Sequence, residues 1–212
     1  MGGGWLPSRR SFVKNDRAVS RRSKAALSAL RLTHVGDCAV DQPSRLSLIV
    51  VMGVAGAGKT TVGQLLAREI GWTFIDADDY HSPENRAKLA AGVELTDQDR
   101  AAWLRDLNRG VLDHIARAER VVLACSALKE PYRAVLTDSI AGSRFVYLKV
   151  TPDLIKARLS SRAHFFDPSL QASQFATLEE PADALVVDGS LPALEIATEI
   201  RRELFGQGGR IA

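Results

Sequence analysis

The chain has 212 residues, of which 46% are hydrophobic and 25% are charged, and its formal net charge is +3. These values are typical of a globular protein with one domain and an appendage. No apolar run approaches the ~20 residues that a membrane-spanning helix requires, so we expect no membrane association. The two cysteines, Cys38 and Cys125, exclude a disulfide framework and lack the spacing of metal ligands. We therefore expect a reducing, cytoplasmic compartment.

The positive charge is concentrated in the N-terminal segment. Residues 1–43 contain eight Lys or Arg and three Asp, whereas residues 44–212 are slightly acidic. We predict that residues 1–43 form a basic, disordered extension, because they offer no core-sized apolar face, although Ser23–Leu32 has the pattern of a short amphipathic helix. Two alternatives stay open for this segment. It has the basic, acid-poor composition of an organelle transit peptide, and basic clusters also occur in nucleic-acid-binding arms.

A nucleotide-binding motif begins the second part of the chain. Leu48–Met52 is an uninterrupted apolar run, which is typical of a strand buried on both faces of a parallel sheet. The next eight residues, GVAGAGKT, match the P-loop pattern G-x-x-x-x-G-K-[ST], and a helical pattern follows from Thr61 to Glu69. In such a loop backbone N–H groups bind phosphate oxygens, while Lys59 reaches the β- and γ-phosphates and the Thr60 hydroxyl binds Mg²⁺. We predict an ATP site formed by Gly53, Val54, Ala55, Gly56, Ala57, Gly58, Lys59, Thr60 and Thr61.

Two aspartates follow the second predicted strand, Trp72–Ile75. Side chains alternate along an extended segment, so Asp76 and Asp78 point the same way at the carboxyl end of the strand, where ligands bind in open α/β sheets. Because two neighbouring carboxylates repel each other, we expect a cation or a substrate hydroxyl between them. No carboxylate ends the third predicted strand, Arg120–Ala124. Asp76 is therefore the best candidate for the protein carboxylate at Mg²⁺.

Strands and helices alternate through the rest of the chain. Helical patterns cover Pro83–Ala91, the segment after the predicted N-cap Thr96, the segment from Pro152 to Phe166 and Leu191–Leu204, and further strands cover Phe145–Val150 and Leu185–Val187. This alternation predicts an α/β fold, a P-loop NTPase with a doubly wound, five-stranded parallel sheet flanked by helices, a helical substrate-binding insertion and a lid. Arg158 and Arg162, four residues apart, would share one helical face above the nucleotide.

Four motifs in order resemble those of the gluconokinase family of small P-loop sugar-acid kinases. Besides the P-loop, the chain has Asp76-Ala77-Asp78 with His81, Pro83 and Asn85, and later Leu95-Thr96-Asp97-Gln98-Asp99-Arg100 with Trp103-Leu104. The family run C-S-A-L-K-x-x-Y-R is intact from Cys125 to Arg133. The lid pattern begins at Arg158 and ends with Ser173, Gln174, Phe175, Glu179 and Pro181. The departures are Leu89 in place of Met, His164 only two residues after Arg162, and the long N-terminal segment.

The resemblance implies transfer of the γ-phosphoryl group of ATP to the 6-hydroxyl of D-gluconate. It implies a homodimer, with a small-molecule substrate and without a nucleic-acid partner. Thr60 and Asp76 would place Mg²⁺, and Arg158 and Arg162 would close over the nucleotide. The implied catalytic residues are Lys59, Asp78 and Lys129, and the implied substrate-binding residues are Asp78, His81, Arg86, Arg100, Lys129 and Arg133.

Two alternative functions stay open. A kinase of another small acid, such as a shikimate kinase, has the same fold and a D-x-D motif. A nucleotide-binding regulatory module with a basic arm belongs to a different class, and Lys59, Thr60 and the two aspartates argue against it. Release of ADP in the presence of a panel of sugar acids separates these alternatives.

Overall fold

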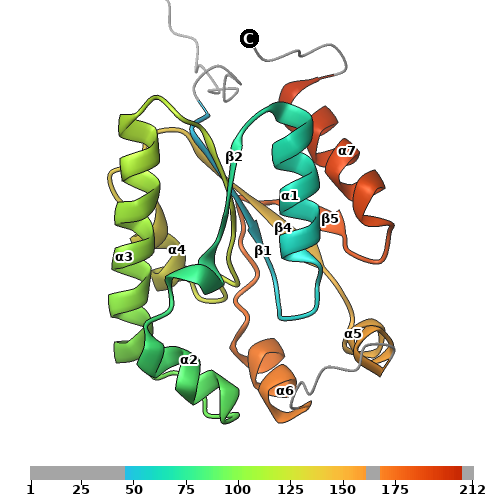
Figure 1. The fold of residues 1–212 in the computed structure, drawn as a ribbon. Helices are drawn as coiled ribbons and strands as arrows, with labels where there is room; N and C mark the ends of the chain where they lie inside the picture. Colours follow the sequence, from blue (N-terminus) through green and yellow to red (C-terminus); the bar gives the residue numbers. More distant parts are fainter. Residues whose placement is uncertain (1–45, 161–167, 207–212) are drawn as a thin grey trace, which may run out of the picture. The chain divides into compact units, whose positions relative to one another are not determined.

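The computed structural model describes residues 46–160 and 168–206, with the backbone alone at residues 159–160 and 168–170 (Figure 1). The predicted helix Ser23–Leu32, Cys38 and Arg162 lie outside these residues, so their predictions stay untested. None of the helices within residues 46–160 and 168–206 combines the length and the apolar character that a membrane-spanning helix needs.

A five-stranded parallel sheet forms the centre of the fold (Figure 1). The strand order is β2-β3-β1-β4-β5, so β1 is the middle strand and the chain winds first to one side of it and then to the other. Leu48 of β1 lies beside Val121 of β3 and Ser143 of β4. The predicted five-stranded, doubly wound parallel sheet is confirmed. The strands are β1 (Leu48–Met52), β2 (Thr73–Asp76), β3 (Val121–Ala124), β4 (Ser143–Lys149) and β5 (Leu185–Asp188).

Helices cover both faces of the sheet. Alternate side chains of β1 enter two separate apolar cores, because successive residues of a strand point to opposite faces. Ile49 and Val51 pack in the core that holds Leu66 and Ile200, and Leu48 packs on the other side with Leu107. The first core lies under α1 (Lys59–Ile70) and α7 (Ala193–Phe205), and the second lies under α3 (Asp97–Ala116) and α4 (Glu130–Thr137) (Figure 1).

Local sequence determines where helices α1 and α3 begin. α1 starts directly after Gly58, whose φ of 101° lies in the left-handed region that favours glycine. α3 starts at a capping box, in which the Thr96 hydroxyl accepts from the Asp99 N–H and the Asp99 carboxylate accepts from the Thr96 N–H. The N-cap predicted at Thr96 is thus confirmed.

Three shorter helices complete the described part. A 3₁₀ turn, η2 (Ala77–Tyr80), and α2 (Pro83–Ala90) lie between β2 and α3, where the helical insertion was predicted. α5 (Pro152–Ser160) covers the first part of the helix predicted to reach Phe166, and residues 161–167 lie outside the description. α4 and α6 (Pro168–Thr177) were not predicted, because neither has a long apolar repeat.

Candidate active site

The P-loop connects β1 to α1 at the carboxyl edge of the sheet. Gly53 is needed in this loop, because its φ is 143° and a Cβ atom there would lie 3.0 Å from the carbonyl oxygen of Leu148. Lys59 folds back over the loop, and its Nζ donates a 3.1 Å hydrogen bond to the carbonyl oxygen of Val54. Burial lowers the pKa of Lys59, and the charge of Asp78 is the largest opposing effect. The loop therefore holds a half-buried cation beside backbone N–H groups, which suits a phosphate.

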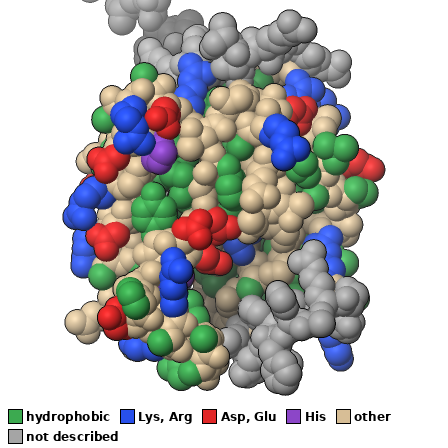
Figure 2. Space-filling view, viewed as in Figure 1, with side chains coloured by type: hydrophobic (Ala, Val, Ile, Leu, Met, Phe, Trp, Pro, Cys, Tyr) green, Lys and Arg blue, Asp and Glu red, His purple; other side chains and the backbone are tan. Residues whose placement is uncertain are grey.

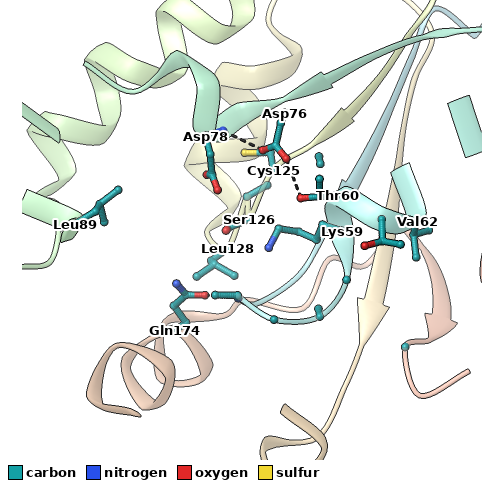
Figure 3. Close-up of a pocket in the computed structure, with 18 of the residues that line it drawn as sticks. Lys59, Thr60, Val62, Asp76, Asp78, Leu89, Cys125, Ser126, Leu128 and Gln174 are labelled. Carbon is teal, nitrogen blue, oxygen red and sulfur yellow. Dashed lines mark hydrogen bonds between the residues drawn. The ribbon is translucent and has the colours of Figure 1, made fainter. Parts of the chain in front are cut away.

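Asp76 is the last residue of β2, whereas Asp78 lies in the 3₁₀ turn η2 that follows, so the extended segment predicted through both aspartates is wrong (Figure 3). The Asp76 carboxylate accepts a 2.8 Å hydrogen bond from the Thr60 hydroxyl through Oδ2 and a 3.1 Å hydrogen bond from the backbone N–H of Asp78 through Oδ1. The Asp78 side chain is 86% exposed. Asp76 is thus anchored to the P-loop, whereas the Asp78 carboxylate remains accessible to a ligand.

Cys125 follows β3 at the position where many P-loop enzymes carry an aspartate. Its side chain is buried, and this burial raises the pKa of the thiol to about 12. The thiol is therefore neutral at physiological pH and supplies no anionic ligand. Within residues 46–160 and 168–206, no three His, Cys, Asp or Glu side chains gather in a way that could hold a metal ion on their own.

A cavity of about 1030 Å³ joins these groups. This volume is at the upper limit of the usual range for small-molecule sites, about 300–1,000 Å³. In Figure 2 the surface is hollowed between α2 and α6, and acidic side chains gather at the rim of the hollow. The lining includes the P-loop, both aspartates, the end of α2, the first part of α3, the segment after β3, α6 and the β5–α7 loop. The cavity therefore has room for a nucleotide and a second small molecule.

Arg158 lies beside the P-loop at one end of the cavity. Its guanidinium donates to the carbonyl oxygen of Ala57 in the P-loop at 3.3 Å and to that of Gly189 after β5 at 2.7 Å. This contact joins the two loops that border one end of the cavity. That Arg158 binds the nucleotide stays a prediction.

His81 and Trp103 form one wall on the other side. Their rings stack with centroids 4.3 Å apart, and the Trp103 indole N–H donates a 2.9 Å hydrogen bond to the carbonyl oxygen of Ala77. The His81 Nε2 lies 3.8 Å from Asp78 Oδ1. Burial lowers the pKa of His81, so the imidazole is neutral at physiological pH. Trp103 was predicted only as part of a motif, and its contact with His81 depends on the tertiary fold.

Asp97 pairs with two of the predicted substrate-binding cations. Arg100 lines the cavity and its Nη1 lies 3.6 Å from Asp97 Oδ1. Lys129 Nζ lies 3.3 Å from the same oxygen, outside the cavity lining, and the Tyr132 hydroxyl also donates to it. Among these groups, the hydrogen bond from Tyr132 contributes most to lowering the pKa of Asp97. Of the four Arg and Lys residues predicted to bind the substrate, Arg100 is the one that lines the cavity.

The other two predicted substrate-binding arginines hold the backbone. Arg133 is buried, and its Nη1 donates to the carbonyl oxygens of Ala127, Leu128 and Glu179. Arg86 donates to the carbonyl oxygens of His81 and Asp79. Neither arginine lines the cavity. Their donors are directed to carbonyl groups of the chain, so these two residues position loops around the site.

Known proteins resemble this chain in both sequence and fold. A family model for shikimate kinase matches residues 55–203. A probable gluconokinase from Mus musculus is 45% identical over 173 residues, which cover 71% of this chain and 94% of that protein. The thermoresistant gluconokinase of Escherichia coli (strain K12) is 39% identical over 151 residues, 68% of this chain and 86% of that protein. The chain belongs to the gluconokinase family.

A solved structure of this family supports the same assignment. The crystal structure of a gluconokinase from Sinorhizobium meliloti 1021 matches with a TM-score of 0.68 and 39% identity, over 76% of this chain and 93% of that one. Membership of the gluconokinase family confirms the resemblance predicted from the four motifs.

Gln174 lines the cavity, and the sequence did not predict its contact with the P-loop. It lies on α6, and its side-chain Oε1 accepts a 2.7 Å hydrogen bond from the backbone N–H of Ala55 in the P-loop (Figure 3). The Ser-Gln-Phe run of the family pattern marked this residue, but 119 positions separate the two partners. Periodicity and spacing carry no information about such a contact.

Proposed function

We propose that the chain transfers the γ-phosphoryl group of ATP to the 6-hydroxyl group of D-gluconate. The observation that carries this proposal is that the P-loop and the two aspartates line one cavity in a chain 45% identical to a probable gluconokinase. Phosphoryl transfer requires charge neutralisation and in-line positioning more than covalent catalysis. The cavity brings together a P-loop for the phosphates and an accessible carboxylate for the hydroxyl group.

The nucleotide would lie between the P-loop and Arg158. The loop's N–H groups and the N-terminus of α1 favour phosphate oxygens, and the Lys59 ammonium can donate to the β- and γ-phosphates. Thr60 and Asp76 fit Mg²⁺, because a hydroxyl and a carboxylate already face each other at 2.8 Å and oxygen atoms are the ligands that this ion prefers. Bound Mg²⁺ would neutralise charge on the phosphates. Arg162 is also proposed for the nucleotide, from its sequence position.

The acceptor would bind on the side of α2 and α3. Asp78 would orient and deprotonate the attacking hydroxyl, since its carboxylate is exposed at the edge that faces the P-loop. Arg100 would pair with the substrate carboxylate, because a guanidinium offers two parallel donors to such a group. His81 would contact the sugar hydroxyls, and Lys129 stays a proposed catalytic residue near Asp97. A homodimer and a cytoplasmic location are further proposals, based on the family resemblance and on cysteine content.

A panel of acceptors tests the proposal. ADP release is measured with ATP, Mg²⁺ and D-gluconate, with shikimate, and without acceptor, using the wild-type protein and Lys59→Ala. We expect release only with gluconate, and a fall of about 10² or more in rate for Lys59→Ala, since the variant lacks a cation at the transferring group. A preference for shikimate would favour the other kinase function. Nucleotide binding without acceptor-dependent release would favour a regulatory module.

A further inference from the structure

Two side chains hold the same peptide unit of the P-loop from its two ends. The Val54 carbonyl oxygen accepts from Lys59 Nζ at 3.1 Å, and the N–H of the next residue, Ala55, donates to Gln174 Oε1 at 2.7 Å. The carbonyl and the N–H of a trans peptide point in opposite directions. Lys59 and Gln174 therefore flank the Val54–Ala55 peptide, and both line the cavity (Figure 3).

The contact with Ala55 fixes which way the Gln174 amide points. A backbone N–H can only donate, so the side-chain oxygen of Gln174 must face it and the side-chain nitrogen must face away. Nε2 has no hydrogen-bond partner among the residues that the structure describes. In Figure 3 this nitrogen points away from the P-loop, toward the side of the cavity where Leu128 lies. An amide with two donors is thus held in a fixed orientation beside the loop.

We propose that Gln174 Nε2 donates a hydrogen bond to the γ-phosphoryl group of the bound nucleotide. This rests on the proposed function only in taking ATP as the ligand of the P-loop. Lys59 marks the position of the β- and γ-phosphates, because the P-loop lysine reaches these groups. Gln174 reaches the same loop peptide from the α6 side and adds a neutral donor where the lysine adds a charge. The α6 helix is thereby attached to the loop by the amide oxygen and to the nucleotide by the amide nitrogen.

A simpler role for Gln174 is to fasten α6 to the P-loop, and one substitution separates the two roles. Gln174→Glu retains an oxygen that accepts from the Ala55 N–H, so it preserves the attachment. It replaces the amide nitrogen by a carboxylate oxygen, which repels a phosphate. Gln174→Ala removes both the acceptor and the donor. A purely structural role predicts a normal Gln174→Glu variant and an impaired Gln174→Ala variant.

The test compares the binding of ADP with that of a non-hydrolysable ATP analogue, by calorimetry, with Mg²⁺ and without any acceptor. We expect Gln174→Glu to weaken analogue binding by about 10-fold or more, as a charge-assisted hydrogen bond is worth about 1.5–3 kcal/mol and 1.4 kcal/mol is tenfold. ADP, which lacks the γ-phosphate, should bind about 3-fold more weakly at most. Ala172→Glu places the same charge on an exposed position of α6 and should leave both affinities unchanged.

The proposal is overturned if Gln174→Glu leaves the ratio of the two affinities at its wild-type value. It is also overturned if Ala172→Glu changes that ratio as much as Gln174→Glu does. Because no acceptor is present, the result does not depend on the identity of the acceptor. A chain that shows the expected affinity ratios but phosphorylates no gluconate contradicts the acceptor assignment alone.

Discussion

The Thr60 hydroxyl donates a 2.8 Å hydrogen bond to the Asp76 carboxylate and so joins the first turn of α1 to the carboxyl end of β2. Asp78 makes no such contact with the P-loop among the described residues, and its side chain is 86% exposed. The two carboxylates therefore differ in what they can reach. In the proposed reaction, Asp76 would bind the cation on the phosphates and Asp78 would face the acceptor.

The two aspartates should respond differently to substitution. Asp76→Asn should raise the Mg²⁺ concentration needed for half-maximal rate, since it removes the anionic oxygen beside Thr60. Asp78→Asn should lower kcat by about 10² to 10⁴, as expected for loss of a general base, and should change the Mg²⁺ dependence little. The measurement is a titration of rate against Mg²⁺ at saturating ATP and gluconate. Interchanged profiles would reverse the two roles, and two fully active variants would leave the acidic pair without a role.

The sequence predicted the parts of the site that local pattern determines. The P-loop lies in one continuous segment between β1 and α1, so its neighbours along the chain specify its geometry. The acidic pair was located in the sequence, but the extended path predicted through Asp76 and Asp78 turns into η2 after Asp76. Arg133 and Gln174 could not be placed in this way. The family motif implies that Arg133 binds the substrate, yet its side chain is buried and donates to carbonyl groups as far away along the chain as Glu179. Only the assembled fold distinguishes such a structural arginine from one that faces the substrate.

Gly110 of α3 is expected to control the position of the turn that carries Asp78. A Cβ atom at Gly110 would lie 2.5 Å from Cε1 of Tyr80, which belongs to η2. Glycine to alanine in a helix interior ordinarily stabilises by about 1 kcal/mol. Here we expect Gly110→Ala to destabilise by about 1–3 kcal/mol through overpacking, and to reduce kcat as well.

Chemical denaturation and initial rates measure these effects of Gly110→Ala. Asp113→Ala is the matched control, because Asp113 is exposed on the same helix and faces no such contact among the described residues. A stabilised, fully active Gly110→Ala variant would show that Tyr80 moves aside without disturbing η2.

Asp99 should make stability depend on acidic pH. Hydrogen bonds from Lys88 and from Thr96 lower the pKa of Asp99 to about 2, against roughly 3.9 for an unperturbed aspartate. Because the folded-state pKa is depressed, this stabilisation is present above about pH 4 and is lost as pH falls toward 2. The melting temperature of Asp99→Asn should therefore lie below that of the wild type near neutral pH, and the gap should shrink with acidification. The control is Asp106→Asn, at an exposed ion pair of α3, whose melting temperature should differ little from that of the wild type. If the difference in melting temperature between Asp99→Asn and the wild type stayed constant as the pH fell, the proposed pH dependence would be refuted.

Deletion of residues 1–42 should leave melting temperature and kinetic constants almost unchanged, because the composition of this segment offers no core-sized apolar face. Deletion of residues 1–47 is the contrasting truncation. It removes Leu46, which is buried, and Ser47, whose hydroxyl donates to the carbonyl oxygen of Ala141 at 2.6 Å. We expect this longer deletion to destabilise the protein. Loss of activity in the shorter deletion would show that the N-terminal segment contributes to the domain.

The identity of the phosphorylated product tests the proposed function most directly. The protein is incubated with ATP, Mg²⁺ and D-gluconate, and the product is examined by phosphorus–proton correlation NMR, with Lys59→Ala as the inactive control. The account predicts one new phosphate ester whose phosphorus couples to the two protons on carbon 6 of gluconate. Coupling to a proton on any other carbon, or no ester from gluconate while shikimate is phosphorylated, would contradict it.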